Sequence, residues 1–470
     1  MSVLLFASFM DLMDATIVNV ALPSVQTGLS ADASQLEWVV SGYLLAFAAL
    51  LITGGRLGDI WGRRRVFLVG VVGFTLASLL AGLAGSATEL VAFRVAQGAF
   101  AGVMVPQVLA IVQALFAPRE RAAVYGIAGA VTGLAAVAGP VVGGALVTGD
   151  VLGSGWRSVF MINVPIGLLL VLGTVAFIPE SRSSRRLRLD VTGVVLVMSG
   201  VLALAYPLIE GRQLGWPEWT VGLILASPVL LVVFVLQQRR RTHADQAPLL
   251  PTRLFADRGF TAGLVTQLFF QVSVASFFLI LTIYLQSGLG FSAWEAGLTI
   301  LPFSLGAILG SGVAVPLTSK LGRLLVLVGA LLQGAGMTWS VAAVAGQGDT
   351  LVIGDLILPL GVAGAGLGLL VVPLLDVALA TVPVDDSGAA SGALSTFQQV
   401  GAALGIAAVG VVFFGIVEGA GTMREAFTSA AWVSVSGATI AAAASLALPG
   451  IEAVRRRATA EALAAPGGPR

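Results

Sequence analysis

Apolar runs of about 20 residues recur from one end of the chain to the other, and a helix of that length crosses the roughly 30 Å hydrocarbon layer of a bilayer. Of the 470 residues, 57% are hydrophobic and 10% are charged. The runs lack the alternation that is typical of strands, so the sequence predicts an all-α membrane protein. We expect fourteen spans, at about 3–27, 36–57, 66–86, 89–116, 122–148, 157–178, 191–210, 219–238, 259–286, 293–318, 324–345, 351–380, 388–417 and 428–449.

The basic residues are divided unequally between the two sides of these spans. Of the 25 Lys and Arg residues, 21 fall at one set of helix ends, and the others are Arg94, Arg157, Arg212 and Arg424. Loops rich in Lys and Arg stay on the cytoplasmic side of a membrane. Because the number of spans is even, we expect both termini on that side of the plasma membrane.

Several kinds of functional site are missing from the sequence. It has no cysteine, and its one histidine, His243, lies in a basic loop, so we expect no disulfide, metal site or bound cofactor. No phosphate-binding glycine loop and no nucleophile–base set is visible, so we expect that the protein is not an enzyme. The run from Arg239 to Arg241 fits a topology anchor better than a nucleic-acid surface. The first apolar run is too long for a cleaved signal peptide and lacks a basic leader, which leaves open an upstream start.

Two long loops, at 179–190 and 239–258, divide the chain into six spans, a pair of spans and six more. A repeat supports this division, because Gly62-Arg63 is matched 260 residues later by Gly322-Arg323. Proteins built from such repeats commonly hold their substrate at the bilayer midplane, between halves that rock against each other. The expected parts are a six-helix bundle at 1–180, an inserted helix pair at 181–240, a loop at 241–258, a second six-helix bundle at 259–450 and a tail at 451–470.

A charged, glycine-containing loop joins the second span to the third. Within it, Gly62 allows a tight turn, and Asp59 can pair with Arg63 or Arg64. The loop resembles a signature of the major facilitator superfamily, with Ile60 in place of a usual basic residue. The resemblance implies the major facilitator fold, with two pseudo-symmetric bundles, and a cytoplasmic latch whose ion pairs break as the halves rock. The implied latch residues are Gly55, Asp59, Gly62, Arg63 and Arg64, although a topology anchor would need only the arginines.

A second motif lies in the fifth span, where Gly139-Pro140 is followed by Gly143-Gly144. Proline kinks a helix, and small residues let a neighbouring helix pack closely, which is common in membrane proteins without any special function. The spacing also resembles a motif of the antiporting members of the superfamily, with Ala135 in place of one further glycine. This resemblance implies export rather than uptake.

Arg94 lies about five residues inside the fourth span, where an unpaired arginine near the centre costs roughly 2.5–3.5 kcal/mol. We expect it to face a cavity or an acid, unless its side chain reaches the outer interface. Together with Gln97 and Gly98, it resembles an element of the superfamily that is implicated in proton transfer. With Trp38 and the fourteen spans, the whole chain resembles the drug:proton antiporter branch.

Two acids, Asp11 and Asp14, lie one turn apart in the first span, where residues three apart share a helix face. Asp14 is about 20 Å from the chain start, near the middle of the span. It matches an aspartate of the antiporter branch, which makes it the expected proton-coupling residue, with a structural ion pair to Arg94 as the alternative. Asp11 and Asp376 match no family position. Asp11 is a candidate for tuning the proton site or selecting cations, and Asp376 for binding a cation or a second proton.

We therefore predict a transporter that exports lipophilic, cationic or amphipathic small molecules in exchange for protons, by alternating access. The expected proton-coupling residues are Asp14, Arg94 and Asp11, and the expected substrate contacts are Asp14, Trp38, Asp376 and Gln97. Its expected partners are the substrate, protons and the lipid bilayer, with the chain acting as a monomer and without nucleic acid. An exporter of one metabolite or lipid, and an importer or facilitator on the same fold, remain alternatives.

Overall fold

Helices make up almost all of the described chain in the computed structural model, which covers residues 1–115, 131, 134–135, 138–150, 153–182, 190–243, 252–347, 350–379, 382 and 387–450. Within these residues, 13 helical segments are long and apolar enough to cross a membrane, and Ala138–Thr148 is a shorter apolar helix inside the expected fifth span. The predicted all-α membrane fold is therefore confirmed. The elements are α1 (Ser2–Leu29), α2 (Ala33–Trp61), α3 (Arg63–Gly82), α4 (Ala87–Leu115), η2 (Gly155–Arg157), α6 (Ser158–Met161), α7 (Asn163–Phe177), α8 (Val191–Glu210), α9 (Glu218–His243), η3 (Thr252–Ala256), α10 (Arg258–Ile283), η4 (Tyr284–Gly288), α11 (Ala293–Leu321), α12 (Arg323–Gln347), α13 (Ile353–Leu379), α14 (Ser387–Glu418) and α15 (Met423–Ser445).

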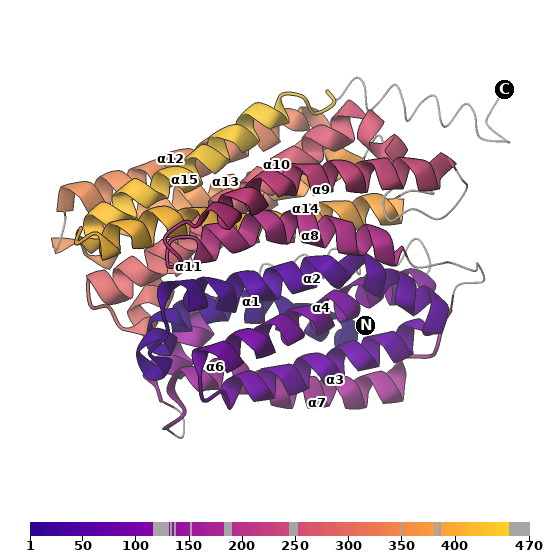
Figure 1. Cartoon of the computed structure of the whole chain (residues 1–470), viewed down its shortest axis with the longest axis horizontal. Helices are drawn as coiled ribbons and strands as arrows, with labels where there is room; N and C mark the ends of the chain where they lie inside the picture. Colours follow the sequence, from indigo (N-terminus) through magenta and orange to yellow (C-terminus); the bar gives the residue numbers. More distant parts are fainter. Residues whose placement is uncertain are drawn as a thin grey trace.

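The helices form two groups that lie side by side (Figure 1). The first group contains α1 to α7, and the second contains α10 to α15. In the first group α2 and α3 pack on α4, and in the second α11 and α12 pack on α13. The groups meet chiefly where α2 lies along α14. The inserted helices α8 and α9 pack on each other, and α8 also contacts both α2 and α14. The inserted pair therefore lies on the seam between the two groups.

The two ends of the helices differ in charge. One end, here the arginine-rich end, carries Arg63–Arg65, Arg182, Arg239–Arg241 and Arg323; the other is the arginine-poor end. Three helices begin at the arginine-poor end with a reciprocal capping box, which satisfies backbone donors that a helix start would leave unpaired. The boxes pair Asp32 with Gln35 in α2, Ser292 with Glu295 in α11 and Thr422 with Glu425 in α15. Because of these caps, α2 and α15 begin three to five residues before the starts expected at 36 and 428.

The repeated Gly-Arg pairs occupy equivalent turns at the arginine-rich end. Gly62 joins α2 to α3 with a φ of 108°, and Gly322 joins α11 to α12 with a φ of 44°. Glycine adopts positive φ without the steric cost that a side chain brings. The sequence repeat thus coincides with a repeat of backbone geometry.

Asp190 fastens α8 to α9 at the arginine-rich end. Its buried carboxylate accepts a 2.9 Å hydrogen bond from the backbone N–H of Gly193 and a 2.7 Å bond from Gln238, and it pairs with Arg241 at 3.2 Å. Burial by itself would raise the pKa of Asp190. The hydrogen bonds from Gln238, Gly193 and Gln237 and the charge of Arg241 outweigh burial, and the pKa is lowered from its usual value.

Asp190→Ala is expected to cost about 1–2 kcal/mol of stability, because it removes a helix cap and takes the acceptor away from the buried N–H of Gly193. Since folding lowers the pKa of Asp190, the stability from its charge is complete above the unfolded pKa of about 3.9 and is lost as pH falls through the folded value. The melting temperatures of wild type and variant should therefore differ at neutral pH and approach each other below about pH 4. A gap of constant size at all pH values would contradict this account. Glu218→Ala, at an exposed residue of α9, is the control and should melt like wild type.

Candidate functional site

A buried ion pair lies between the first and fourth helices of the first group. Asp14 is near the middle of the 28-residue α1, and its Oδ2 lies 2.6 Å from Nη1 of Arg94 in α4. Asp14 is 0% exposed and Arg94 is 1% exposed. Arg94 also donates from Nε to the carbonyl of Val39 in α2, at 3.0 Å. Arg94 therefore faces an acid, which is one of the two positions that the sequence allowed. Its guanidinium is buried inside the protein and does not reach the surface.

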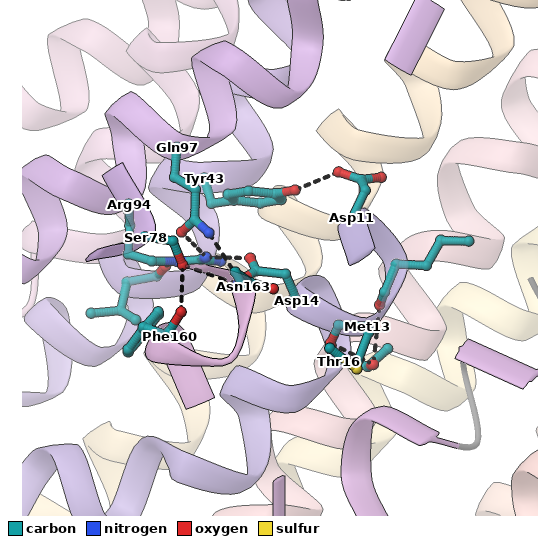
Figure 2. A network of polar contacts seen from close by, with 12 residues as sticks. Asp11, Met13, Asp14, Thr16, Tyr43, Ser78, Arg94, Gln97, Phe160 and Asn163 are labelled. Atoms are coloured by element: carbon teal, nitrogen blue, oxygen red, sulfur yellow. Dashed lines mark hydrogen bonds and ion pairs between the residues drawn. The ribbon is translucent and has the colours of Figure 1, made fainter. Parts of the chain in front are cut away.

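Two amide side chains complete the surroundings of Asp14 (Figure 2). Gln97 and Asn163 both donate to its Oδ1, at 2.9 and 2.6 Å. Asn163 also donates to the hydroxyl of Ser78 at 3.0 Å, and that hydroxyl donates to the carbonyl of Phe160 at 2.9 Å. The donors come from α4 and α7, and all these polar side chains are fully buried. Asp14 therefore accepts from three donors, one of them charged, and such charge-assisted hydrogen bonds are the strong ones.

Asn163 lies in the expected span at 157–178, which the structure forms as one apolar segment, Gly155–Phe177. The helices α6 and α7 meet in this segment at Ile162, whose φ of −59° and ψ of −28° are still helical. Pro165 is in the first turn of α7, where its missing N–H costs little. Neither Asn163 nor Ser78 was among the predicted site residues, although a buried amide within an apolar span is the kind of signal that could have identified Asn163.

Asp11 has a different environment from Asp14, one turn away. Its Oδ1 accepts a 2.7 Å hydrogen bond from the hydroxyl of Tyr43, and it is 6% exposed. The ring of Tyr43 in turn lies 4.2 Å from the guanidinium of Arg94, within cation–π range. Figure 2 shows Tyr43 between the two parts of the network, with its hydroxyl toward Asp11. Within the described residues, Asp11 has no ion pair, so one carboxylate of the two is paired with a cation.

Of the predicted substrate contacts, the structure brings Gln97 to Asp14 and places the others elsewhere. Trp38 donates from Nε1 to Glu210 at 2.8 Å, at the arginine-poor end. Asp376 is exposed near the arginine-rich end of α13. No hydrogen bond or ion pair joins Trp38 or Asp376 to the Asp14 network within the described parts of the chain.

The loop between α2 and α3 is tied to the chain that follows α7. The carboxylate of Glu180 accepts a hydrogen bond from the backbone N–H of Arg64 at 3.1 Å and pairs with Arg65 at 3.7 Å. The backbone N–H of Arg63 donates to the carbonyl of Ser181 at 2.9 Å. Glu180, which follows α7, is thus an acidic partner of the α2–α3 loop that the sequence did not identify. The side chain of Asp59 lies outside the described residues, and Gly55 of the predicted latch packs on Pro106 of α4.

The glycines of the fifth span lie against α1 on one side and α11 on the other. A Cβ on Gly139 would overlap Thr16, and a Cβ on Gly143 would lie 2.7 Å from Ile17. On the other face, a Cβ on Gly144 would lie 2.6 Å from the carbonyl of Ala293. The motif therefore packs against the segment of α1 that directly follows Asp14, and also joins the two helix groups.

The family model described as Major Facilitator Superfamily matches residues 4–406 of this sequence. The chain belongs to this superfamily. The probable actinorhodin transporter of Streptomyces coelicolor is 42% identical over 421 residues, which cover 89% of this chain and 72% of that protein. The puromycin resistance protein pur8 of Streptomyces alboniger is 35% identical, with 88% and 81% covered. The multidrug resistance protein Stp of Mycobacterium tuberculosis (strain CDC 1551 / Oshkosh) is 32% identical, with 86% and 73% covered.

Solved structures of other transporters have the same fold. A POT family transporter in complex with 5-aminolevulinic acid matches with a TM-score of 0.67 at 15% identity, over 93% of this chain and 94% of that one. A bacterial homologue of the human lysosomal transporter Spinster matches with a TM-score of 0.62 at 17% identity, over 97% and 96%. The major facilitator superfamily is a family of membrane transporters, so this multi-pass membrane protein is a transporter of small molecules and not an enzyme.

Gly144→Ala is expected to disturb the contact between the two halves of this major facilitator transporter. The added methyl group meets the backbone of α11, and overpacking of this kind costs about 1–3 kcal/mol. This cost destabilises the arrangement in which the fifth span packs on α11, and therefore lowers the fraction of the protein that adopts it. We expect transport to fall by roughly 5- to 150-fold while the protein still folds. Gly312→Ala, in α11, is the matched control, because nothing lies within 4 Å of its added methyl group. Equal transport rates of the two variants in proteoliposomes would contradict the prediction.

Proposed function

We propose that this transporter exports lipophilic small molecules, cationic or amphipathic, from the cytoplasm in exchange for protons. Support for export comes from relatives named as a probable actinorhodin transporter, a puromycin resistance protein, and a tetracenomycin C resistance and export protein. We place the protein in the plasma membrane as a monomer, with its termini and its arginine-rich end in the cytoplasm, because basic loops stay on that side. An exporter of one metabolite or lipid would share these features and differ only in substrate breadth.

The observation that carries the coupling proposal is the pair of carboxylates in the middle of α1. Asp14 is paired with Arg94, whereas Asp11 has a neutral donor, Tyr43. Burying a carboxylate without a cation costs more than burying the acid, so we assign the exchangeable proton of this conformation to Asp11. The Asp14–Arg94 pair stays charged and holds α1 against α4 until the helices move. When substrate displaces the proton, a cation takes its place beside Asp11.

Alternating access requires that one end of the transporter be closed while the other opens. Among the described residues, the hydrogen bonds between the helix groups lie toward the arginine-poor end. The side chain of Gln286 donates to the carbonyl of Val20 at 2.9 Å, and the backbone N–H of Trp294 donates to Thr148 at 3.0 Å. We infer that this arrangement is closed toward the outside and receives substrate from the cytoplasm.

An efflux assay with a panel of compounds tests the proposal. Cells that lack their own pumps and express the chain should accumulate less of a lipophilic cation than cells with the empty vector, and an uncoupler of the proton gradient should remove the difference. Accumulation above the vector control would indicate an importer. Equilibration that does not respond to the uncoupler would indicate a facilitator, and either result would refute proton-coupled export.

A further inference from the structure

Three segments meet on the seam between the helix groups at the arginine-poor end. Glu37, in the first turns of α2, is fully buried, and its Oε1 lies 3.9 Å from Nη1 of Arg212. Arg212 follows α8, in the turn to α9, and its Nε lies 3.1 Å from Oε2 of Glu418, the last residue of α14. Arg212 of the inserted helix pair therefore lies between an acid of the first group and an acid of the second.

Arg212 is attached more firmly to α14 than to Glu37. Its Nη1 donates a 2.9 Å hydrogen bond to the carbonyl of Gly410, and its guanidinium lies 5.1 Å from the ring of Phe414. The same glycine makes room for the acid, because a Cβ on Gly410 would overlap the carboxylate of Glu37. Where the two helix groups meet at this end, the carboxylate of Glu37 in α2 therefore lies directly against the backbone of α14.

The carboxylate of Glu37 is poorly compensated. Neither of its oxygens has a hydrogen-bond donor among the described residues. The charged groups that face it are Arg212 from the α8–α9 turn, Glu210 from α8, Glu418 from α14 and Asp32 from the start of α2. One cation at 3.9 Å thus faces several acids. A proton on such a group would remove both the burial of an unpaired charge and the repulsion between acids.

We propose that Glu37 is a second proton-binding site, whose protonation stabilises the closed arrangement of α2 and α14 at the arginine-poor end and whose ionisation lets the two helices separate there. The proposal rests on proton-coupled exchange and adds the place where an outside proton acts on the closed end. A neutral Glu37 can stay buried against α14 without a full counter-charge, whereas an ionised Glu37 is stabilised when the helices part and water reaches it. Arg212 of the inserted pair is the cation that partly balances the ionised form.

Spin labels on the full-length chain in lipid nanodiscs test this site, because the sequence has no cysteine of its own. Leu83→Cys and Val352→Cys label two exposed residues at the arginine-poor end, one in each helix group. Without substrate, the distance between the labels in wild type should shorten as pH falls, because the proton is bound more tightly in the closed arrangement. Glu37→Gln, which is neutral at every pH, should show the shorter distance already at neutral pH. Arg212→Gln removes the cation that favours the ionised carboxylate, so it should lengthen the distance at neutral pH and leave it short at low pH, which keeps the test available if Glu37→Gln does not fold.

Glu218→Gln and Arg424→Gln, at exposed residues of the same end, are the matched controls and should keep the wild-type distances. A Glu37→Gln or Arg212→Gln protein with wild-type distances and a wild-type pH response overturns the proposal. Drug–proton exchange is measured in a separate assay, so proton-coupled export and the role of Glu37 can be refuted independently. Intact exchange with unchanged distances in Glu37→Gln refutes only the role of Glu37. The expected distance changes without any exchange refute the coupled export and leave the Glu37 site supported.

Discussion

Asp14→Asn is expected to abolish transport and to lower the stability of the protein by roughly 3–5 kcal/mol, because it leaves Arg94 buried without a counter-charge. The pair is 2.6 Å apart and essentially inaccessible, so water cannot replace the lost carboxylate. An asparagine can still accept a hydrogen bond, but it cannot balance the guanidinium. Thermal melting of the purified variant, together with transport in proteoliposomes, measures both effects.

The double variant Asp14→Asn/Arg94→Gln separates the charge from the function. Removing both charges of a buried pair is far less costly than removing one, so the double variant should regain most of the melting temperature and remain inactive. Glu218→Gln, at an exposed acid of α9, is the control for a substitution of the same chemistry on the surface. Wild-type stability of Asp14→Asn would show that Arg94 is solvated or paired elsewhere, which would contradict the buried pair.

Asp11→Asn is expected to have the opposite profile. It leaves an oxygen that can still accept the hydrogen bond from Tyr43 and removes no ion pair, so its effect on stability should be no more than about 1 kcal/mol. The variant cannot release or bind a proton at this position, and we expect the loss of proton exchange with a drug gradient. Downhill movement of the cation should persist, because the helix packing is unchanged, but at a lower apparent affinity, because no carboxylate remains at position 11 to pair with the cation. The readout is internal pH and cation release, measured on the same liposomes.

The two variants together show which acid of α1 carries the coupling proton and which one forms the structural ion pair. Loss of proton exchange with intact folding in Asp11→Asn, and loss of folding stability in Asp14→Asn, would match the assignment made from the geometry. If Asp11→Asn exchanged protons at the wild-type rate, Asp14 would have to carry the coupling proton, as the sequence alone suggested.

The sequence was sufficient to predict the membrane fold and the pairing of Arg94 with a buried acid. Apolar periodicity identified the spans, because each must satisfy its backbone within the bilayer. An arginine and an aspartate inside apolar spans had to face partners, and both are in the buried pair. The helix starts at Ala33 and Met423 were missed by a few residues, since capping boxes extend a helix beyond its apolar run.

Contacts between distant parts of the chain could not be predicted in the same way. Asn163 reaches Asp14 because α7 packs on α1 and α3. Arg212 stood out in the sequence only as an arginine on the less basic side, and its position between Glu37 and Glu418 depends on where α8 docks. Spacing along the sequence carries no information about such pairings, which follow from packing.

Proton exchange in a purified system tests the central claim most directly. Proteoliposomes would be loaded with tetraphenylphosphonium, a lipophilic cation that does not titrate, and diluted into medium without it, while potassium and valinomycin hold the membrane potential at zero. A trapped pH dye should report acidification of the lumen as the cation leaves through the wild-type protein, and no acidification with Asp11→Asn. Release of the cation by the wild-type protein with no change in internal pH would contradict proton-coupled exchange.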